Sequence, residues 1–157
     1  MHIIGDRFGF DHPEMAGRLQ AYGIDRIHLE CLELTRQLAE SRLFDICGHI
    51  DHAKKFGPPD DVEAVAAAAS AALRAVRAAG MLIEVNTAGL RKAVAEPYPS
   101  PGLLAEAHAL GIPLVFGSDA HKPHEVGHAF GRAVELARAA GYAASRRLSS
   151  RETEALA

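Results

Sequence analysis

The sequence has little net charge, few cysteines and no long apolar run. Its 157 residues include 17 Lys and Arg and 20 Asp and Glu, for a formal charge of -3, so no basic excess indicates nucleic acid. Cys31 and Cys47 lack the paired C-x-x-C spacing, and we expect two reduced, buried thiols. No stretch reaches the roughly 18 apolar residues of a membrane span, and no signal peptide is visible. These absences predict a cytoplasmic protein that binds neither nucleic acid nor a membrane.

Three common catalytic motifs are also missing. The sequence has no G-x-S-x-G elbow, no G-x-x-x-x-G-K-[ST] loop and no G-x-G-x-x-G fingerprint, so covalent serine chemistry and nucleotide-cradling loops have no support. The run HEVGH at 124–128 matches the zinc-peptidase pattern H-E-x-x-H in letters. It directly follows Pro123, however, and no later His supplies a third ligand, so we do not expect a peptidase.

Short β-type runs alternate with helical patterns along the chain. The spacing predicts strands near 2–5, 44–48, 81–86 and 112–117, a weaker strand near 142–148, and helices over 25–41, 60–79, 100–110 and 124–140. This alternation indicates an α/β fold with a parallel sheet covered by helices. An open doubly wound sheet and a (β/α) barrel both remain possible, and in either one function gathers at the carboxyl ends of the strands.

Polar side chains stand at these strand ends. His2 lies on the first strand, His49 follows the second, Glu84 and Asn86 close the third, and Asp119 and His121 follow the fourth. Imidazole and carboxylate together suit Zn²⁺, Mn²⁺ or Fe²⁺. Because one residue separates them, Asp119 and His121 can serve one site as two metal ligands, or as a ligand and an acid/base group. Alternatively, Asp119 caps the next helix and His121 is a solvated loop residue.

The loop NTAGLRK at 86–92 offers cations beside this edge. Gly89 permits a tight turn, and Arg91 and Lys92 could hold a phosphate, Arg91 in bidentate fashion and Lys92 as a point charge. Solvation of both side chains is the alternative. Asp51 and Lys54, in the segment after the second strand, could form a simple surface pair worth under about 1 kcal/mol.

The chain resembles the C-terminal portion of the PHP (polymerase and histidinol phosphatase) superfamily, most closely the histidinol-phosphatase type. The blocks that carry the likeness occur in family order: MHIIGDRFGFDHP, FDICGHIDHAKKFG, IEVNTAGLRKAVAEPYPSPGLLAEA and GIPLVFGSDAHKPHEVGHAF. The resemblance implies a TIM-like (β/α) barrel and a hydrolase that cleaves phosphate monoesters, in histidine biosynthesis, at a cluster of up to three divalent metal ions.

The resemblance also implies roles for individual residues. The metal ligands would be His2, His49, Asp119 and His121. Asp119 and His121 would also be the catalytic groups that handle protons, where coordination leaves them free to do so. The substrate, a small phosphorylated metabolite, would meet Asn86, Arg91 and Lys92, with Glu84 beside the site. The metals would activate a water for attack on phosphorus.

The chain departs from the family at its N-terminus. Family members carry an H-x-H metal motif, further His residues and a bridging Glu before the block that matches MHII, and here the sequence starts at that block. We therefore expect one N-terminally incomplete PHP domain over residues 1–157, a partial barrel with impaired activity. It could associate with itself or with a separate N-terminal piece. One alternative is a non-catalytic metal-binding or interaction module. Another is a different PHP activity, such as a phosphodiesterase or a polymerase-associated proofreading role.

Overall fold

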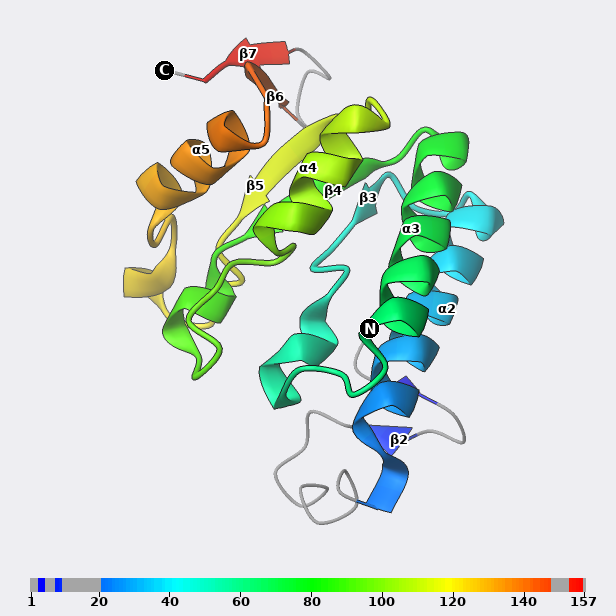
Figure 1. The fold of residues 1–157 in the computed structure, drawn as a ribbon. Helices are drawn as coiled ribbons and strands as arrows, with labels where there is room; N and C mark the ends of the chain where they lie inside the picture. Colours follow the sequence, from blue (N-terminus) through cyan, green and yellow to red (C-terminus); the bar gives the residue numbers. More distant parts are fainter. Residues whose placement is uncertain (1–2, 5–7, 10–20, 148–152, 157) are drawn as a thin grey trace.

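The computed structural model describes residues 3–4, 8–9, 21–147 and 153–156. Its helices are α2 (Ile24–Ser41), α3 (Val62–Ala79), α4 (Pro101–Ala109) and α5 (Phe130–Ala139), with 3-10 helices η2 (His52–Phe56), η3 (Ala88–Arg91) and η4 (Pro123–Glu125). Its strands are β1 (Ile3–Ile4), β2 (Phe8–Gly9), β3 (Ile46–Cys47), β4 (Leu82–Asn86), β5 (Leu114–Gly117), β6 (Ala144–Arg146) and β7 (Thr153–Ala155). Figure 1 shows the central sheet with helices packed around it.

The central sheet is parallel, as the alternating pattern predicts. Its order is β3-β4-β5, and β4 pairs with β5 from Ile83 opposite Leu114 to Asn86 opposite Gly117. The fold is therefore mixed α/β, whereas closure into a partial TIM-like barrel remains a prediction. The strand expected near 2–5 corresponds to β1, which does not join this sheet. It pairs antiparallel with β2, and antiparallel neighbours can be joined by a short connection without a crossover helix. The weak strand is β6, which pairs antiparallel with β7.

Helices α2 and α3 lie side by side along one flank of the sheet (Figure 1). The Asp61 carboxylate accepts a hydrogen bond from the backbone N–H of Ala64 at 3.0 Å and caps α3, and the left-handed Gly80 ends this helix. The carboxylate of Asp25 in α2 accepts the backbone N–H of Asp60 at 2.7 Å. This bond fixes the start of α3 beside the start of α2.

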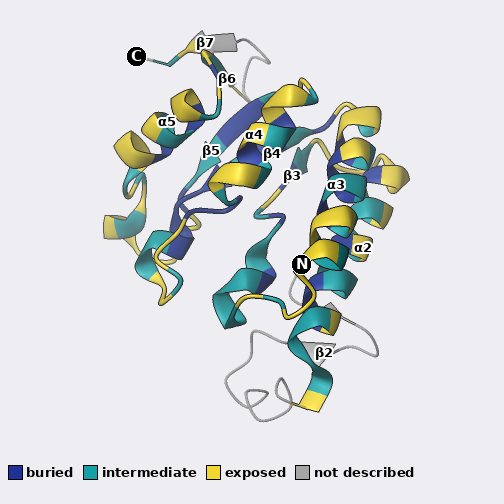
Figure 2. Cartoon of the chain, in the orientation of Figure 1, coloured by how far each residue is buried: buried dark blue, intermediate teal, exposed yellow. Residues whose placement is uncertain are grey.

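The core lies between the sheet and the inner helix faces, as the burial colours of Figure 2 show. Its fully buried side chains include Leu73 and Val76 of α3, Ile83 and Val85 of β4, and Leu114 of β5. Ile83 and Val85 of β4 face the core, whereas Leu82 and Glu84, which alternate with them, are only partly buried. Cys31 and Cys47 are free thiols; Cys47 is buried and Cys31 half-buried. None of the described helices combines the length and apolarity needed to cross a bilayer.

The helix expected over 124–140 is wrong in its first third. Residues 123–125 form only the short η4, and α5 begins at Phe130. Gly127 and Ala129 both have left-handed backbones, with φ of 71° and 55°. A right-handed helix cannot pass through two such residues, so the chain turns before α5 starts.

Candidate functional site

The carboxyl ends of β3, β4 and β5 meet at one edge of the sheet. Gly48 and His49 follow β3, Asn86 is the last residue of β4, and Ser118 and Asp119 follow β5. The parallel register sets these strand ends next to each other, as the sequence predicts for three of its four strands. His2, the predicted contribution of the first strand, lies outside the described residues.

Glu84 stands at the centre of this edge. Its Oε2 accepts the backbone N–H of His49 at 3.2 Å and lies 3.5 Å from Nδ1 of the same imidazole. The side-chain amide of Asn86 donates to the same oxygen at 3.0 Å. Burial alone would raise the pKa of Glu84, but the hydrogen bonds from His49 and Asn86 outweigh burial and hold this pKa below its ordinary value. The site therefore contains a fixed negative charge beside His49.

Asn86 supports this carboxylate from within the core. Its side chain is 2% exposed, and its Oδ1 accepts the backbone N–H of Ala88 at 2.8 Å. Hydrogen bonds thus run from the start of η3 through Asn86 and Glu84 to the backbone of His49. The predicted contact between Asn86 and substrate stays a prediction.

Arg91 joins the loop after β4 to the loop after β5. One of its terminal nitrogens, Nη2, donates to the carbonyls of Ser118 and Asp119 at 2.9 and 3.1 Å. The same nitrogen lies 3.7 Å from the Glu125 carboxylate. The other, Nη1, is buried and has no hydrogen-bond partner in the part of the chain that the structure describes. Lys92, its predicted companion, is exposed.

Asp119 and His121 lie on the exposed turn that follows β5. Asp119 has a left-handed backbone, with φ of 47°, so this strand exit is sharply bent. Nδ1 of His121 lies 3.0 Å from the Asp119 carbonyl. A carbonyl only accepts, so we assign the Nδ1 proton to this bond, which leaves Nε2 of the neutral ring as the atom able to bind a metal or a proton.

The side chain of Glu125 holds this turn in place. Its Oε2 accepts the backbone N–H of His121 at 2.8 Å. This bond, with further help from Arg91, lowers the pKa of Glu125. Sequence reasoning missed Glu125, because the letters HEVGH suggest a role only through the zinc-peptidase pattern. The structure separates those letters: Glu125 ends η4, and His128 lies beyond it, before α5. The residues of this pattern therefore do not lie on one continuous helix, and the expectation that they form no peptidase site stays a prediction.

The described residues do not by themselves form a metal site. Across 3–4, 8–9, 21–147 and 153–156, no group of three or more His, Cys, Asp and Glu side chains is arranged to hold an ion. His49, Asp119 and His121 are at the same sheet edge but do not form such a group. Since His2 is not described, the four-residue ligand set remains a prediction.

Asp51 and Lys54 are not the surface pair that the sequence allows. Their side chains are only 14% and 13% exposed, and Lys54 Nζ lies 3.0 Å from Asp51 Oδ2. The same oxygen accepts the backbone N–H of Ser100 at 2.7 Å, so Asp51 connects η2 to the start of α4. The ring of His52 lies between those of His49 and Tyr98, with centroids 4.9 and 5.2 Å away. No local sequence signal marks the contacts of Asp51 with Ser100 and of His52 with Tyr98, which join residues far apart in the chain.

Comparisons with known proteins find similarity to histidinol-phosphatases. A family model described as PHP-associated matches residues 104–133. The chain is 42% identical over 143 residues to a Deinococcus radiodurans protein named probable histidinol-phosphatase; the match covers 90% of this chain and 53% of that protein. It is 41% identical over 87 residues to the histidinol-phosphatase of Bacillus subtilis, covering 53% of this chain and 32% of the relative.

A solved structure gives the same indication. The crystal structure of a candidate histidinol phosphatase from Listeria monocytogenes superposes with a TM-score of 0.64 at 30% identity, over 72% of this chain and 46% of that one. The chain spans about half the length of the Deinococcus relative and a smaller share of the Bacillus one. The chain is therefore homologous to the C-terminal part of histidinol-phosphatases.

Proposed function

We propose that this chain takes part in metal-dependent hydrolysis of a phosphate monoester, with histidinol phosphate as the first substrate to test. The 42% identity to a probable histidinol-phosphatase over 90% of the chain supports this activity. The proposal includes a cytoplasmic location and a sheet that forms part of a TIM-like barrel.

The observation that carries the proposal is the set of polar groups along a single sheet edge. His49 follows β3, Glu84 lies within the central strand β4, Asp119 follows β5, and Arg91 joins two of the loops. A rigid parallel sheet fixes such groups more precisely than mobile loops would. In this proposal the buried Nη1 of Arg91 supplies a hydrogen-bond donor for a phosphate oxygen, with Lys92 as a second, more mobile cation.

The proposed ligands for divalent Zn, Mn or Fe are His2, His49, Asp119 and His121, in a site of up to three ions. The described residues alone do not fit an ion, so in this proposal further donors complete the site. A second copy of the chain or a separate polypeptide segment could supply them. Within this chain, Glu84 and Asn86 hold His49, and Glu125 holds His121.

A non-catalytic metal-binding or interaction module is the second candidate. It is favoured by the lack of a three-donor group among the residues that the structure describes. In this case the fold would persist for its surface, and substitutions at Asp119 or Arg91 would change no reaction.

Phosphate release from histidinol phosphate tests the proposal. The 157-residue chain is assayed with Zn²⁺, Mn²⁺ and Fe²⁺ in turn, together with Asp119→Asn and Arg91→Ala. Arg132→Ala is the matched control, because Arg132 is an exposed residue of α5 paired with Glu135. We expect slow, metal-dependent release that both site variants abolish and the control retains. Release that persists unchanged in Asp119→Asn, or no release with any of the three metals, would favour the module.

A further inference from the structure

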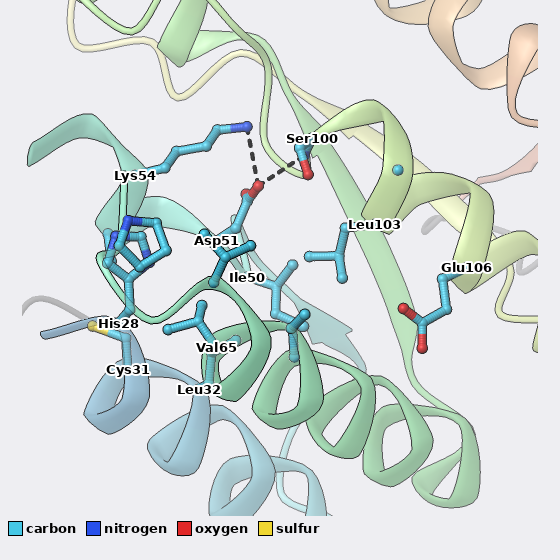
Figure 3. A pocket seen from close by; sticks show the side chains of 16 residues that line it. His28, Cys31, Leu32, Ile50, Asp51, Lys54, Val65, Ser100, Leu103 and Glu106 are labelled. Carbon is cyan, nitrogen blue, oxygen red and sulfur yellow. Dashed lines mark hydrogen bonds and ion pairs between the residues drawn. The ribbon is translucent and has the colours of Figure 1, made fainter. Parts of the chain in front are cut away.

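A cavity lies among the helices, apart from the predicted metal ligands. This cavity of about 340 Å³ opens between α2, η2, the first half of α3 and the start of α4 (Figure 3). Its wall is mostly apolar and includes Leu32, Ile50, Val65, Ala69 and Leu103. This volume falls within the range of pockets that bind small molecules, which are typically about 300–1,000 Å³.

One end of the cavity is polar and incompletely hydrogen bonded. Asp51 Oδ2 receives the Ser100 backbone N–H and the Lys54 ammonium. Its other oxygen, Oδ1, is buried and has no hydrogen-bond partner within the described chain. Lys54 cannot readily satisfy it, because the same ammonium also contacts the Pro97 carbonyl at 2.6 Å and the Glu96 carboxylate at 3.3 Å. A buried carboxylate oxygen without a donor costs free energy that a ligand N–H could recover.

The charges around the cavity favour a cation. Its lining residues include two carboxylates, Asp51 and Glu106, against the single ammonium of Lys54, which Glu96 also neutralises. Nε2 of His28 lies 3.1 Å from the Gly57 carbonyl, so this nitrogen donates its hydrogen to that carbonyl. Figure 3 shows Asp51 and Ser100 together at one end, with Glu106 apart from them on α4.

We propose that this cavity binds a small primary amine with a compact apolar body, its ammonium group at Asp51 and its apolar part against Ile50, Val65 and Leu103. The inference does not depend on the phosphatase proposal, because it uses none of the predicted metal ligands.

Occupancy of the cavity would be felt at the sheet edge. Asp51 and His49 belong to one turn, in which the N–H of His52 donates to the His49 carbonyl at 3.0 Å and that of Lys54 to the Asp51 carbonyl at 3.1 Å. Ile50, between them in sequence, lines the cavity. An amine that binds Asp51 should therefore shift the His49 backbone amide resonance, which gives the chain a route for regulation.

The test is titration of the whole chain with three ring compounds that differ in one group: benzylamine, benzyl alcohol and toluene. Chemical shifts of backbone amides report the binding. We expect benzylamine to bind with Kd on the order of 1 mM, about tenfold more tightly than the other two, and to shift Ile50, Ala53 and Leu103. Equal affinity for all three compounds would overturn the proposal. So would the absence of chemical-shift changes at these residues at benzylamine concentrations up to 20-fold above the expected Kd.

Two further variants locate the bound amine. Val65→Phe fills the cavity and should abolish these shifts, whereas Ala67→Phe, on an exposed position of the same helix outside the cavity, should leave them intact. Glu106→Gln removes one carboxylate without disturbing Asp51. It should weaken the binding of benzylamine by about twofold to threefold and leave the binding of toluene unchanged. Unchanged benzylamine binding in a folded Val65→Phe chain would contradict the proposed location.

Discussion

The carboxylate of Glu84 occupies the space that a side chain at residue 117 would need. A Cβ added to Gly117 would collide with Glu84 Oε1, and one added to Gly48 would lie 3.3 Å from Oε2. Gly48, just after β3, and Gly117, in β5, thus make room for one charged side chain at the sheet edge. The backbone of Gly117 is not left-handed, so the requirement for glycine there is one of space.

The first prediction follows from this contact. Gly117→Ala should displace Glu84 and lower the free energy of unfolding by about 1–3 kcal/mol, the usual cost of overpacking. Urea denaturation measures the change. Gly131→Ala is the control, because a Cβ there meets nothing within 4 Å, and it should be neutral or slightly stabilising. Equal effects at the two positions would show that Glu84 moves aside without cost.

Two buried tyrosines should respond differently to loss of their hydroxyl groups. Tyr142 Oη donates to the Ile112 carbonyl at 2.9 Å, so Tyr142→Phe leaves a buried acceptor unpaired and should cost about 1 kcal/mol. Tyr98 Oη has no hydrogen-bond partner among the described residues, so Tyr98→Phe should change stability by about 0.5 kcal/mol or less. Thermal unfolding of both variants gives the comparison. A larger loss for Tyr98→Phe would reveal a bound water or ligand at that hydroxyl.

Asp51 should matter more to stability than an exposed helix cap. Asp51→Ala leaves the largely buried Lys54 ammonium and the Ser100 N–H without this partner, at a cost of about 2–4 kcal/mol. Asp61→Ala removes only the exposed N-cap of α3 and should cost about 1 kcal/mol. The urea midpoints of the two variants show which substitution lowers the unfolding free energy more. If Asp51→Ala lowers it no more than Asp61→Ala does, the interactions of Asp51 with Lys54 and Ser100 are as weak as those on the surface.

Stability should fall at alkaline pH. Burial raises the pKa of Cys31 to about 11 and those of Cys47, Tyr98 and Tyr142 to about 12. In the unfolded chain these groups lose their protons near pH 9 to 10, so the folded state binds more protons above pH 9. Unfolding free energy should therefore be insensitive to these groups below pH 8.5 and decrease from pH 9 to 12.

One lysine acts in the opposite sense. Burial, with the nearby Lys92, lowers the pKa of Lys55 to about 8, so this group alone would add stability as pH rises from 8 to 10.5. A single half-buried amine should not offset four buried acids. Urea titrations at half-unit steps of pH measure the balance, and a rise in stability between pH 9 and 11 would contradict the burial of these thiols and phenols.

Local sequence patterns predict the helices well because the signals are local. The helix expected over 25–41 is α2 (Ile24–Ser41), and that expected over 60–79 is α3, which begins at Val62 because Asp61 caps it. The same reasoning fails at 124–140, where Ala129 takes a left-handed backbone that its residue type does not announce.

The polar residues of the sheet edge are predictable because parallel strands end on one side. Their mutual contacts are not predictable in this way. The bond between Asp51 and Ser100 and the fit of Glu84 against Gly117 join residues many positions apart, and no periodicity encodes such pairs. The cavity between α2, α3 and α4 is likewise a product of tertiary packing.

The central claim, that side chains from separate strand ends share one divalent cation, is tested most directly by adding Mn²⁺ to the isotope-labelled chain. Paramagnetic broadening of the imidazole signals of His49 and His121 is followed by NMR. The account predicts that both signals broaden together at the same metal concentration, and that Asp119→Asn weakens both to the same extent. Broadening of one imidazole without the other, or of neither, would contradict a shared site.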